Sequence, residues 1–246
     1  MNISYKIVHI TDLHISEDGS PVRDIDVRGN FLAVLESAGR FMPDLVVLGG
    51  DLAAEEGELG AYYWIKEVLT DISIPYVIVP GNHDVLLNLD EVFDIKDSLQ
   101  QSWDFIWQND DLVIIGLDSS KGEISNQQLH WLHKSFKSLE KDALLFMHHP
   151  PIDCGCAFMD TNYPLFNRKD VFHLISDCSQ VAAVFCGHYH TEKTVIRENK
   201  QIYLTPATMM QMSQTSSSYE VDSLRPGWRL IEWTASKLST RVIYLD

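Results

Sequence analysis

The chain has 246 residues, of which 45% are hydrophobic and 22% are charged, so it has the composition of an ordinary soluble globular protein. Its length suits a single domain spanning residues 1–246. With 19 basic and 35 acidic residues the formal net charge is -16, which argues against a general nucleic-acid or membrane-binding surface.

The first part of the chain alternates short apolar runs with helical patterns. We expect buried strands at 5–10, 45–48 and 76–79, with helices at 30–41 and 60–69. Farther along, strands at 111–117, 144–147 and 181–186 alternate with helices at 125–139 and 172–178. Ser125 is a suitable N-cap for the first of these two helices.

The end of the chain is rich in strands and has few helical patterns. We expect strands at 192–197, 201–204, 228–233 and 239–245, and a polar, Ser-rich surface loop at 209–223. Strand–helix alternation followed by a β-rich end predicts an α/β protein in which two sheets pack together, with helices on the outer faces.

Five of the predicted strands end in clusters of polar residues. These clusters are Asp12-Leu13-His14, Gly50-Asp51, Gly81-Asn82-His83-Asp84, His148-His149 and Gly187-His188-Tyr189-His190. Ligands of α/β proteins gather at the carboxyl ends of the strands, so five clusters far apart in sequence can converge on one site.

The residue types in these clusters favour a metal site. If the chain is extended there, residues two apart point to the same side, so Asp12 and His14 can reach one ion together. Asp51 offers two oxygens and can bridge two ions, while Asn82 offers a neutral oxygen. Imidazole, carboxylate and amide ligands suit iron, manganese or zinc better than magnesium or calcium. Each motif alone is weak, because Gly-Asp is usually a turn, but coincidence in all five at once is improbable.

The order D-x-H, G-D, G-N-H-D, H-H-P and G-H-x-H resembles the calcineurin-like metallophosphoesterase superfamily. More narrowly, the chain resembles the bacterial class III cyclic-nucleotide phosphodiesterases, through Gly122-Glu123-Ile124-Ser125 before Gln128-Leu129-His130-Trp131-Leu132, and through Pro226-Gly227-Trp228-Arg229. The resemblance implies a four-layer αββα sandwich of two mixed sheets flanked by helices, and a site for two metal ions, whether iron, manganese or zinc.

The resemblance also implies roles for individual residues. The first metal would be held by Asp12, His14, Asp51 and His190, and the second by Asp51, Asn82, His148 and His188. His148 is preferred to His149 from its place in the motif. The substrate phosphate would contact His14, Asp51, Asn82, His83, His148 and His190. His83 would be the catalytic acid, and Asp84 either orients neighbouring groups or is a turn residue.

The implied reaction is hydrolysis of a small-molecule phosphodiester by hydroxide held between the two ions. The leading hypothesis is conversion of 3′,5′-cyclic AMP to the 5′-monophosphate. One alternative is another small diester, such as a glycerophosphodiester, and a second is a non-catalytic protein-binding scaffold. The loop with Pro150-Pro151 and Asp153-Cys154-Gly155-Cys156 borders the site in the family and can alter which leaving group fits.

Several other features have simpler explanations than a site. Cys154, Cys156, Cys178 and Cys186 lack zinc-site spacing, so we expect reduced thiols. With no signal peptide and no run near the ~18 apolar residues of a membrane span, we expect a cytoplasmic protein. We expect Trp103, Phe105 and Trp107 to form one face of a strand, and Trp228 to pack in the core. His130 and His133 should lie on the surface, and His9 should be buried and hydrogen-bonded. Oligomeric state has no signature in the sequence.

Overall fold

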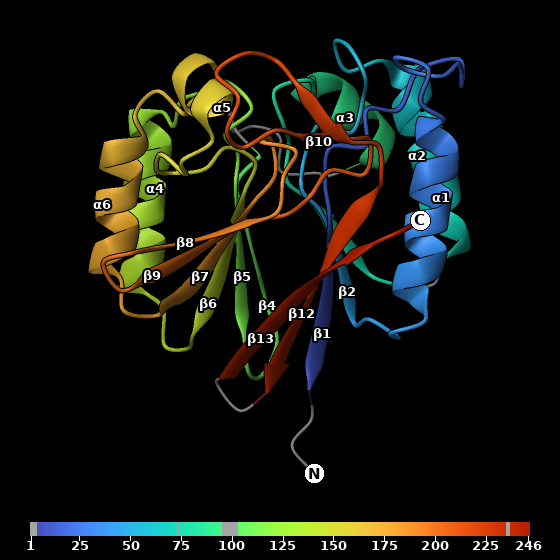
Figure 1. Ribbon diagram of the computed structural model, residues 1–246. Coiled ribbons are helices and arrows are strands. Elements are labelled where there is room, and N and C mark those ends of the chain that lie inside the picture. The colour runs from blue at the N-terminus through green and yellow to red at the C-terminus, as the bar shows by residue number, and fades with distance from the viewer. Residues whose placement is uncertain (1–3, 73, 95–102, 235–236) are drawn as a thin grey trace.

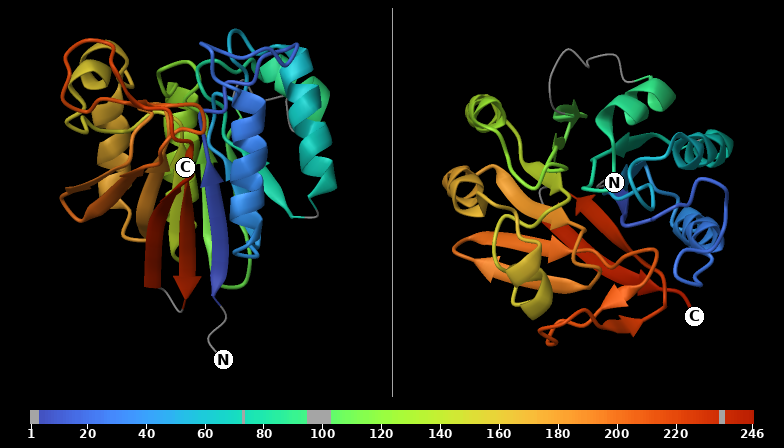
Figure 2. Two further views of the ribbon diagram at one scale, coloured as in Figure 1. Left: turned by 45° about the vertical axis from the view of Figure 1, so that its right-hand side comes forward. Right: turned by 90° about the horizontal axis from the view of Figure 1, so that it is seen from above.

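Two β-sheets pack face to face, and helices cover the outer face of each (Figure 1). This arrangement comes from a computed structural model that describes residues 4–72, 74–94, 103–234 and 237–246. Seen from above, the two sheets lie between two sets of helices (Figure 2). The predicted four-layer αββα sandwich of mixed sheets is therefore confirmed. Within the described residues, every helix is too short or too polar to cross a membrane.

The first sheet has the strand order β13-β12-β1-β2-β3. Its strands are β1 (Tyr5–Ile10), β2 (Leu45–Leu48), β3 (Tyr76–Ile78), β12 (Gly227–Thr234) and β13 (Lys237–Tyr244). Strands β1, β2 and β3 are parallel, whereas β12 runs antiparallel to β1. The chain thus returns from its far end to complete the sheet that it began, and all three parallel strands end at one edge.

The second sheet has the order β4-β5-β6-β7-β9-β8. Its strands are β4 (Phe105–Gln108), β5 (Val113–Leu117), β6 (Ala143–Met147), β7 (Val181–Cys186), β8 (Lys193–Arg197) and β9 (Lys200–Leu204). The four strands β5, β6, β7 and β9 are parallel, and the edge strands β4 and β8 are antiparallel to their neighbours. Phe105 and Trp107 lie in β4, as predicted, whereas Trp103 precedes the strand. Trp107 stacks on Tyr5 of the first sheet with ring centroids 5.6 Å apart.

Six helices lie within the described residues. They are α1 (Val27–Gly39), α2 (Leu59–Asp71), α3 (Leu86–Phe93), α4 (Asn126–Lys137), α5 (Ala157–Asn162) and α6 (Arg168–Asp177). Helix α1 begins three residues earlier than expected, because the Asp26 side chain caps it by accepting a hydrogen bond from the Gly29 amide. Ser125 caps α4 as predicted, in a reciprocal capping box with Gln128. His130 and His133 are exposed on α4 as expected.

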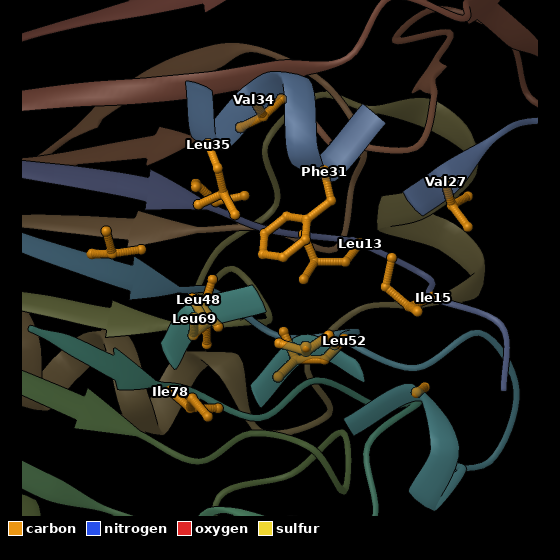
Figure 3. Packing of buried hydrophobic residues seen from close by; sticks show 14 of the residues in the cluster. Leu13, Ile15, Val27, Phe31, Val34, Leu35, Leu48, Leu52, Leu69 and Ile78 are labelled. Carbon is orange, nitrogen blue, oxygen red and sulfur yellow. The ribbon is translucent and has the colours of Figure 1, made fainter. Parts of the chain in front are cut away.

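Buried apolar side chains fill three layers. One cluster lies between the sheets and includes Val47, Phe146 and Ile231. A second joins the first sheet to α1, α2 and α3, where Phe31 of α1 lies over Leu48 and Leu13 (Figure 3), and the third joins the second sheet to α4, α5 and α6. Each such large side chain contributes about 1.5–3 kcal/mol when fully buried. This packing fixes the strand ends and the residues that follow them.

The prediction of a surface loop at 209–223 was wrong. The segment forms a small hairpin of β10 (Gln211–Met212) and β11 (Val221–Ser223), and Met209, Met210 and Met212 are buried. The Met209 amide donates to the carbonyl of Asp12 and the Met212 amide to the carbonyl of His190. The Ser-rich tip and most of β11 are exposed, and their polarity concealed the buried methionines in and before β10.

Candidate metal centre

The five polar clusters converge where the parallel strands of both sheets end, at the top of Figure 1. Each follows its predicted strand, namely β1, β2, β3, β6 or β7. Six carboxylate and imidazole residues of these clusters are at most 7% exposed, and we call them the Asp–His cluster: Asp12, His14, Asp51, His148, His188 and His190. The expectation that these segments meet is therefore correct.

Asp12, His14 and His190 form the first half of the Asp–His cluster. One potential ligand atom from each residue lies within 4.8 Å of the others. Nε2 of His190 is 3.3 Å from Oδ1 of Asp12 and 3.1 Å from Nε2 of His14. Three donor atoms thus face one small volume, as a bound cation requires.

Asp51, His148 and His188 form the second half, again with one potential ligand atom from each within 4.8 Å of the others. Nε2 of His148 is 3.2 Å from Oδ2 of Asp51. The same carboxylate oxygen is 3.8 Å from Nε2 of His14, which belongs to the first half. Asp51 therefore lies between the two halves.

Backbone carbonyls outside the cluster orient three of its imidazole rings. Nδ1 of His148 donates to the carbonyl of Gly49 at 2.7 Å, and Nδ1 of His190 donates to that of Met210 at 3.1 Å. Nε2 of His188 donates to the carbonyl of Tyr163 at 2.9 Å. Because a carbonyl only accepts, the other nitrogen of each ring is the one that can offer a lone pair to an ion after losing any proton it carries, which is how metal-binding histidines are usually held.

One atom of the cluster fits a metal ion particularly well. Nε2 of His148 is fully buried and makes no hydrogen bond, although it lies among carboxylates. Burial alone would lower the pKa of His148, but the carboxylates of Asp51 and Asp12 raise it to about 9. Burial would likewise raise the pKa of Asp12, but His190 and His148 lower it to about 2. The cluster therefore holds ionised carboxylates that attract positive charge.

Backbone geometry overturns one step of the sequence reasoning. Asp12 and His14 do not lie in an extended segment, because their φ angles are 56° and 48°. Asp51, His188 and His190 are also left-handed, with φ angles of 50°, 67° and 46°. Such backbone costs roughly 1–2 kcal/mol per non-glycine residue, and clusters of it mark functional sites. Asp12 and His14 do converge, but through consecutive tight turns. The matching expectation that His188 and His190 reach one ion together was wrong, because they lie in different halves of the cluster.

The glycines of the motifs allow these turns to pack against each other. A Cβ atom on Gly81 would overlap the amide nitrogen of Asp51 and lie 2.9 Å from its carboxylate carbon. A Cβ atom on Gly187 would overlap the Thr11 hydroxyl and lie 2.7 Å from a carboxylate oxygen of Asp12. Glycine is therefore needed for close approach of neighbouring segments as well as for turning.

The motif after β3 supplies three further residues at the edge of the cluster. The His83 amide donates to Oδ1 of Asp51 at 2.8 Å, and its Nδ1 donates to the carbonyl of Glu55 at 2.9 Å. Asn82 is exposed and lines the adjoining cavity. Asp84 is buried and accepts from the amides of Leu52 and Gly81 and from the hydroxyl of Tyr62. Asp84 therefore fits both of its predicted roles, since it orients neighbouring groups and its own amide closes the turn by donating to the Gly81 carbonyl at 3.2 Å.

Two other buried histidines lie near the Asp–His cluster but outside both halves. Nδ1 of His149 lies 3.1 Å from the hydroxyl of Ser119, and its ring packs on His188. Nδ1 of His9 lies 2.7 Å from the hydroxyl of Thr205, as expected for a hydrogen-bonded core histidine. Trp228 is fully buried in the core, also as expected.

A cavity of about 760 Å³ opens beside the cluster. It exposes His14, Asp51, Asn82, His83, His188 and His190, and its other walls include three segments in which the sequence indicated no site residue. These wall residues include Arg23 before α1, Phe158 and Tyr163 at α5, and Met210 and Tyr219 of the β10–β11 hairpin. Phe158 and Tyr163 lie close together in the sequence and were the available signal for this wall, but the residues that complete the wall are distant in sequence.

Comparison with known proteins identifies the family. The model of the calcineurin-like phosphoesterase family matches residues 5–192. The chain is 40% identical to a protein of Fibrobacter succinogenes named as a probable cyclic nucleotide phosphodiesterase, over 97% of this chain and 93% of that one. It is 27% identical to the 3′,5′-cyclic adenosine monophosphate phosphodiesterase of Escherichia coli K12, over 97% and 89% of the two chains.

A solved structure gives the same fold. The crystal structure of a dimetal phosphatase from Danio rerio superposes with a TM-score of 0.69 at 13% identity, covering 98% of this chain and 99% of that one. The family implies a site for two divalent metal ions, and the Asp and His groups described above could hold such ions. The chain belongs to the calcineurin-like phosphoesterase family of hydrolases.

Proposed function

We propose that the protein is a two-metal phosphodiesterase that hydrolyses 3′,5′-cyclic nucleotides, with cyclic AMP favoured, to the 5′-monophosphates. The observation that carries the proposal is the Asp–His cluster, in which buried donor atoms face each other and Nε2 of His148 lies among carboxylates without a hydrogen bond. The names of the two relatives support the substrate class.

The cluster would hold one ion through Asp12, His14, Asp51 and His190. A second ion would bind Asp51, Asn82, His148 and His188, so that the Asp51 carboxylate serves both. Mixed imidazole, carboxylate and amide ligands favour iron, manganese or zinc. Two such cations supply Lewis-acid charge to the phosphate and make water nucleophilic at neutral pH.

The remaining roles fall to residues that border the cavity. Because Nδ1 of His83 donates to the Glu55 carbonyl, the other ring nitrogen is available to the substrate. We assign His83 as the acid that protonates the leaving 3′ oxygen, and the Asn82 amide as a donor to the phosphate. The phosphate would also contact His14, Asp51, His148 and His190.

The size of the cavity suits a nucleotide, because its volume of about 760 Å³ lies within the range of small-ligand sites. A small diester such as a glycerophosphodiester would use the same ions, so the cluster alone does not separate the two substrates. A protein-binding scaffold would need no such array of buried, strained ligand residues.

A product assay tests the proposal. Manganese-loaded protein is given cyclic AMP, glycerophosphocholine or bis-p-nitrophenyl phosphate, and products are separated by chromatography. We expect 5′-AMP from cyclic AMP, with a higher kcat/KM than for glycerophosphocholine. Turnover of bis-p-nitrophenyl phosphate alone, or a preference for glycerophosphocholine, would contradict the cyclic-nucleotide assignment.

A further inference from the structure

Three aromatic side chains line the cavity beyond the Asp–His cluster, and we call them the aromatic wall: Phe158, Tyr163 and Tyr219. Phe158 belongs to α5, Tyr163 follows that helix, and Tyr219 lies near the tip of the β10–β11 hairpin. The ring centroid of Phe158 is 5.7 Å from that of Tyr163 and 6.2 Å from that of Tyr219, with near edge-to-face geometry. Tyr163 and Tyr219 remain 53% and 43% exposed.

A cation from a third segment completes this part of the cavity. The guanidinium carbon of Arg23 lies 5.2 Å from the ring centroid of Tyr219. Arg23 and the next residue, Asp24, both have positive φ angles, so the chain turns sharply before α1 and presents Arg23 to the cavity. Exposed aromatic faces with a planar cation beside them are the components of a stacking site for nucleic-acid bases.

The aromatic wall is joined to the Asp–His cluster through the backbone. The carbonyl of Tyr163 accepts from His188, and the carbonyl of Met210 accepts from His190. The hydroxyl of Tyr219 in turn lies 3.7 Å from the sulfur of Met210. The two segments that present the aromatic rings therefore also orient two of the histidines, which fixes the wall relative to the cluster.

We propose that Phe158, Tyr163, Tyr219 and Arg23 form a subsite that binds the base of the nucleotide by stacking. The proposal rests on the proposed function, because the base must be carried by the molecule whose phosphodiester bond is cleaved. A glycerophosphodiester has no planar group to place there. The subsite thus gives the cavity a reason to prefer cyclic nucleotides, which the Asp–His cluster cannot supply.

The test compares two substrates that differ only in the base. These are cyclic AMP and the base-free 3′,5′-cyclic phosphate of 1-deoxyribose, each assayed with manganese-loaded protein. Stacking of a base on an aromatic side chain changes binding about 5- to 100-fold. We therefore expect Tyr219→Ala to lower the ratio of kcat/KM for cyclic AMP over the base-free substrate by about that factor. Tyr219→Phe, which keeps the ring, should retain most of the ratio.

A binding measurement separates this inference from the proposed function. Calorimetry on the metal-loaded protein compares AMP with ribose 5-phosphate, and we expect Tyr219→Ala and Phe158→Leu each to reduce the preference for AMP. Phe166→Ala is the control, because Phe166 is 79% exposed but does not line the cavity. A preference for AMP that depends on Tyr219 supports the subsite even if no diester is hydrolysed. An unchanged preference in both variants overturns it, whatever the turnover.

Discussion

The Asp–His cluster and the aromatic wall share one cavity but are built in different ways. Residues of the cluster are at most 7% exposed, and their strained turns are held by backbone hydrogen bonds and by glycines that leave no room for a methyl group. Tyr163 and Tyr219 of the wall are about half exposed and lie in connecting segments. The proposed chemistry would therefore depend on the core of the fold, whereas the proposed substrate choice would depend on exposed side chains of loops. The backbone carbonyls of Tyr163 and Met210 in those loops also orient His188 and His190, so only the side chains of the wall can change without disturbing the cluster.

The largest effect should come from Asp51, the residue shared by both halves of the cluster. Asp51→Ala should abolish binding of both ions, because each would lose a ligand. Metal-ion catalysis contributes several kcal/mol, so activity should fall about 10³-fold or more. Elemental analysis checks the first expectation, with Asp18→Ala, a cavity carboxylate outside the cluster, as control. Two ions per chain in Asp51→Ala would refute the shared role.

His83 should have the next largest effect, and only on turnover. His83→Ala should keep both ions but lose about 10²–10⁴-fold in kcat on cyclic AMP, the usual contribution of a general acid. The loss of kcat on bis-p-nitrophenyl phosphate should be much smaller, because the nitrophenolate leaving group needs no proton. His130→Ala, an exposed histidine of α4, should behave as wild type. Equal losses on both substrates would show that His83 is not the acid.

The positions of this cluster could be predicted from sequence because each lies directly after a short, strongly apolar strand. Two buried sheets with parallel strands leave one edge where such residues meet, so Asp12 and His188 could be expected together despite their separation in sequence. The local backbone could not be predicted. Positive φ angles at Asp12 and His14 depend on contacts with Gly50 and Asp51, which only the folded chain provides.

The elements that form the aromatic wall escaped prediction for a related reason. Helix α5 has six residues, too few to show a helical period, and the β10–β11 hairpin hides its buried methionines beneath a polar tip. Helix α3 was also missed, since it is only eight residues long and follows a motif that reads as a turn. Convergence of α5, the hairpin and Arg23 is a tertiary property that no local pattern encodes.

Replacing a glycine by alanine should destabilise the protein beside the tightly packed cluster but not at an open position elsewhere. Gly187→Ala should lower the free energy of unfolding by about 1–3 kcal/mol, the usual cost of overpacking, because its Cβ would overlap the Thr11 hydroxyl. Gly39→Ala is the matched control. Gly39 is the last residue of α1, and a Cβ atom added there would have no atom of another segment within 4 Å. Gly39→Ala should therefore raise the free energy of unfolding by about 0.5–1 kcal/mol. Chemical denaturation of both metal-free variants measures the difference, and equal effects would contradict it.

Metal affinity should depend on pH through His148. With its pKa raised to about 9, the metal-free protein holds a proton at pH 7 on the nitrogen that the ion needs. Metal uptake should therefore release a proton, and affinity should rise about tenfold per pH unit from pH 7 toward 9. Calorimetry in buffers of different ionisation enthalpy counts the protons, and an affinity that stays constant between pH 6 and 8 would refute this assignment.

The same proton should affect stability, with the opposite dependence on pH. Because the folded pKa of His148 lies above the unfolded value near 6.5, the folded metal-free chain binds the proton more tightly than the unfolded chain. Its contribution to stability is fully present below pH 6.5 and is lost as pH rises toward 9. The Tm of the metal-free protein should therefore fall as pH rises over that range, whereas the Tm of the metal-loaded protein should not show this fall.

The smallest expected effect concerns the wall. In Arg23→Gln the base would lose the cation that we place beside it, and an exposed cation–π contact is worth about 0.5–1 kcal/mol, so KM for cyclic AMP should rise only about 2- to 5-fold. Metal content should not change, and loss of the contact between Arg23 and the Tyr219 ring should lower the free energy of unfolding by at most about 1 kcal/mol. Arg197→Gln is a close control, because Arg197 lies over the Phe172 ring at 5.4 Å but away from the cavity. A KM that rises equally in both variants would point to overall charge, whereas a rise confined to Arg23→Gln would assign substrate choice to the wall.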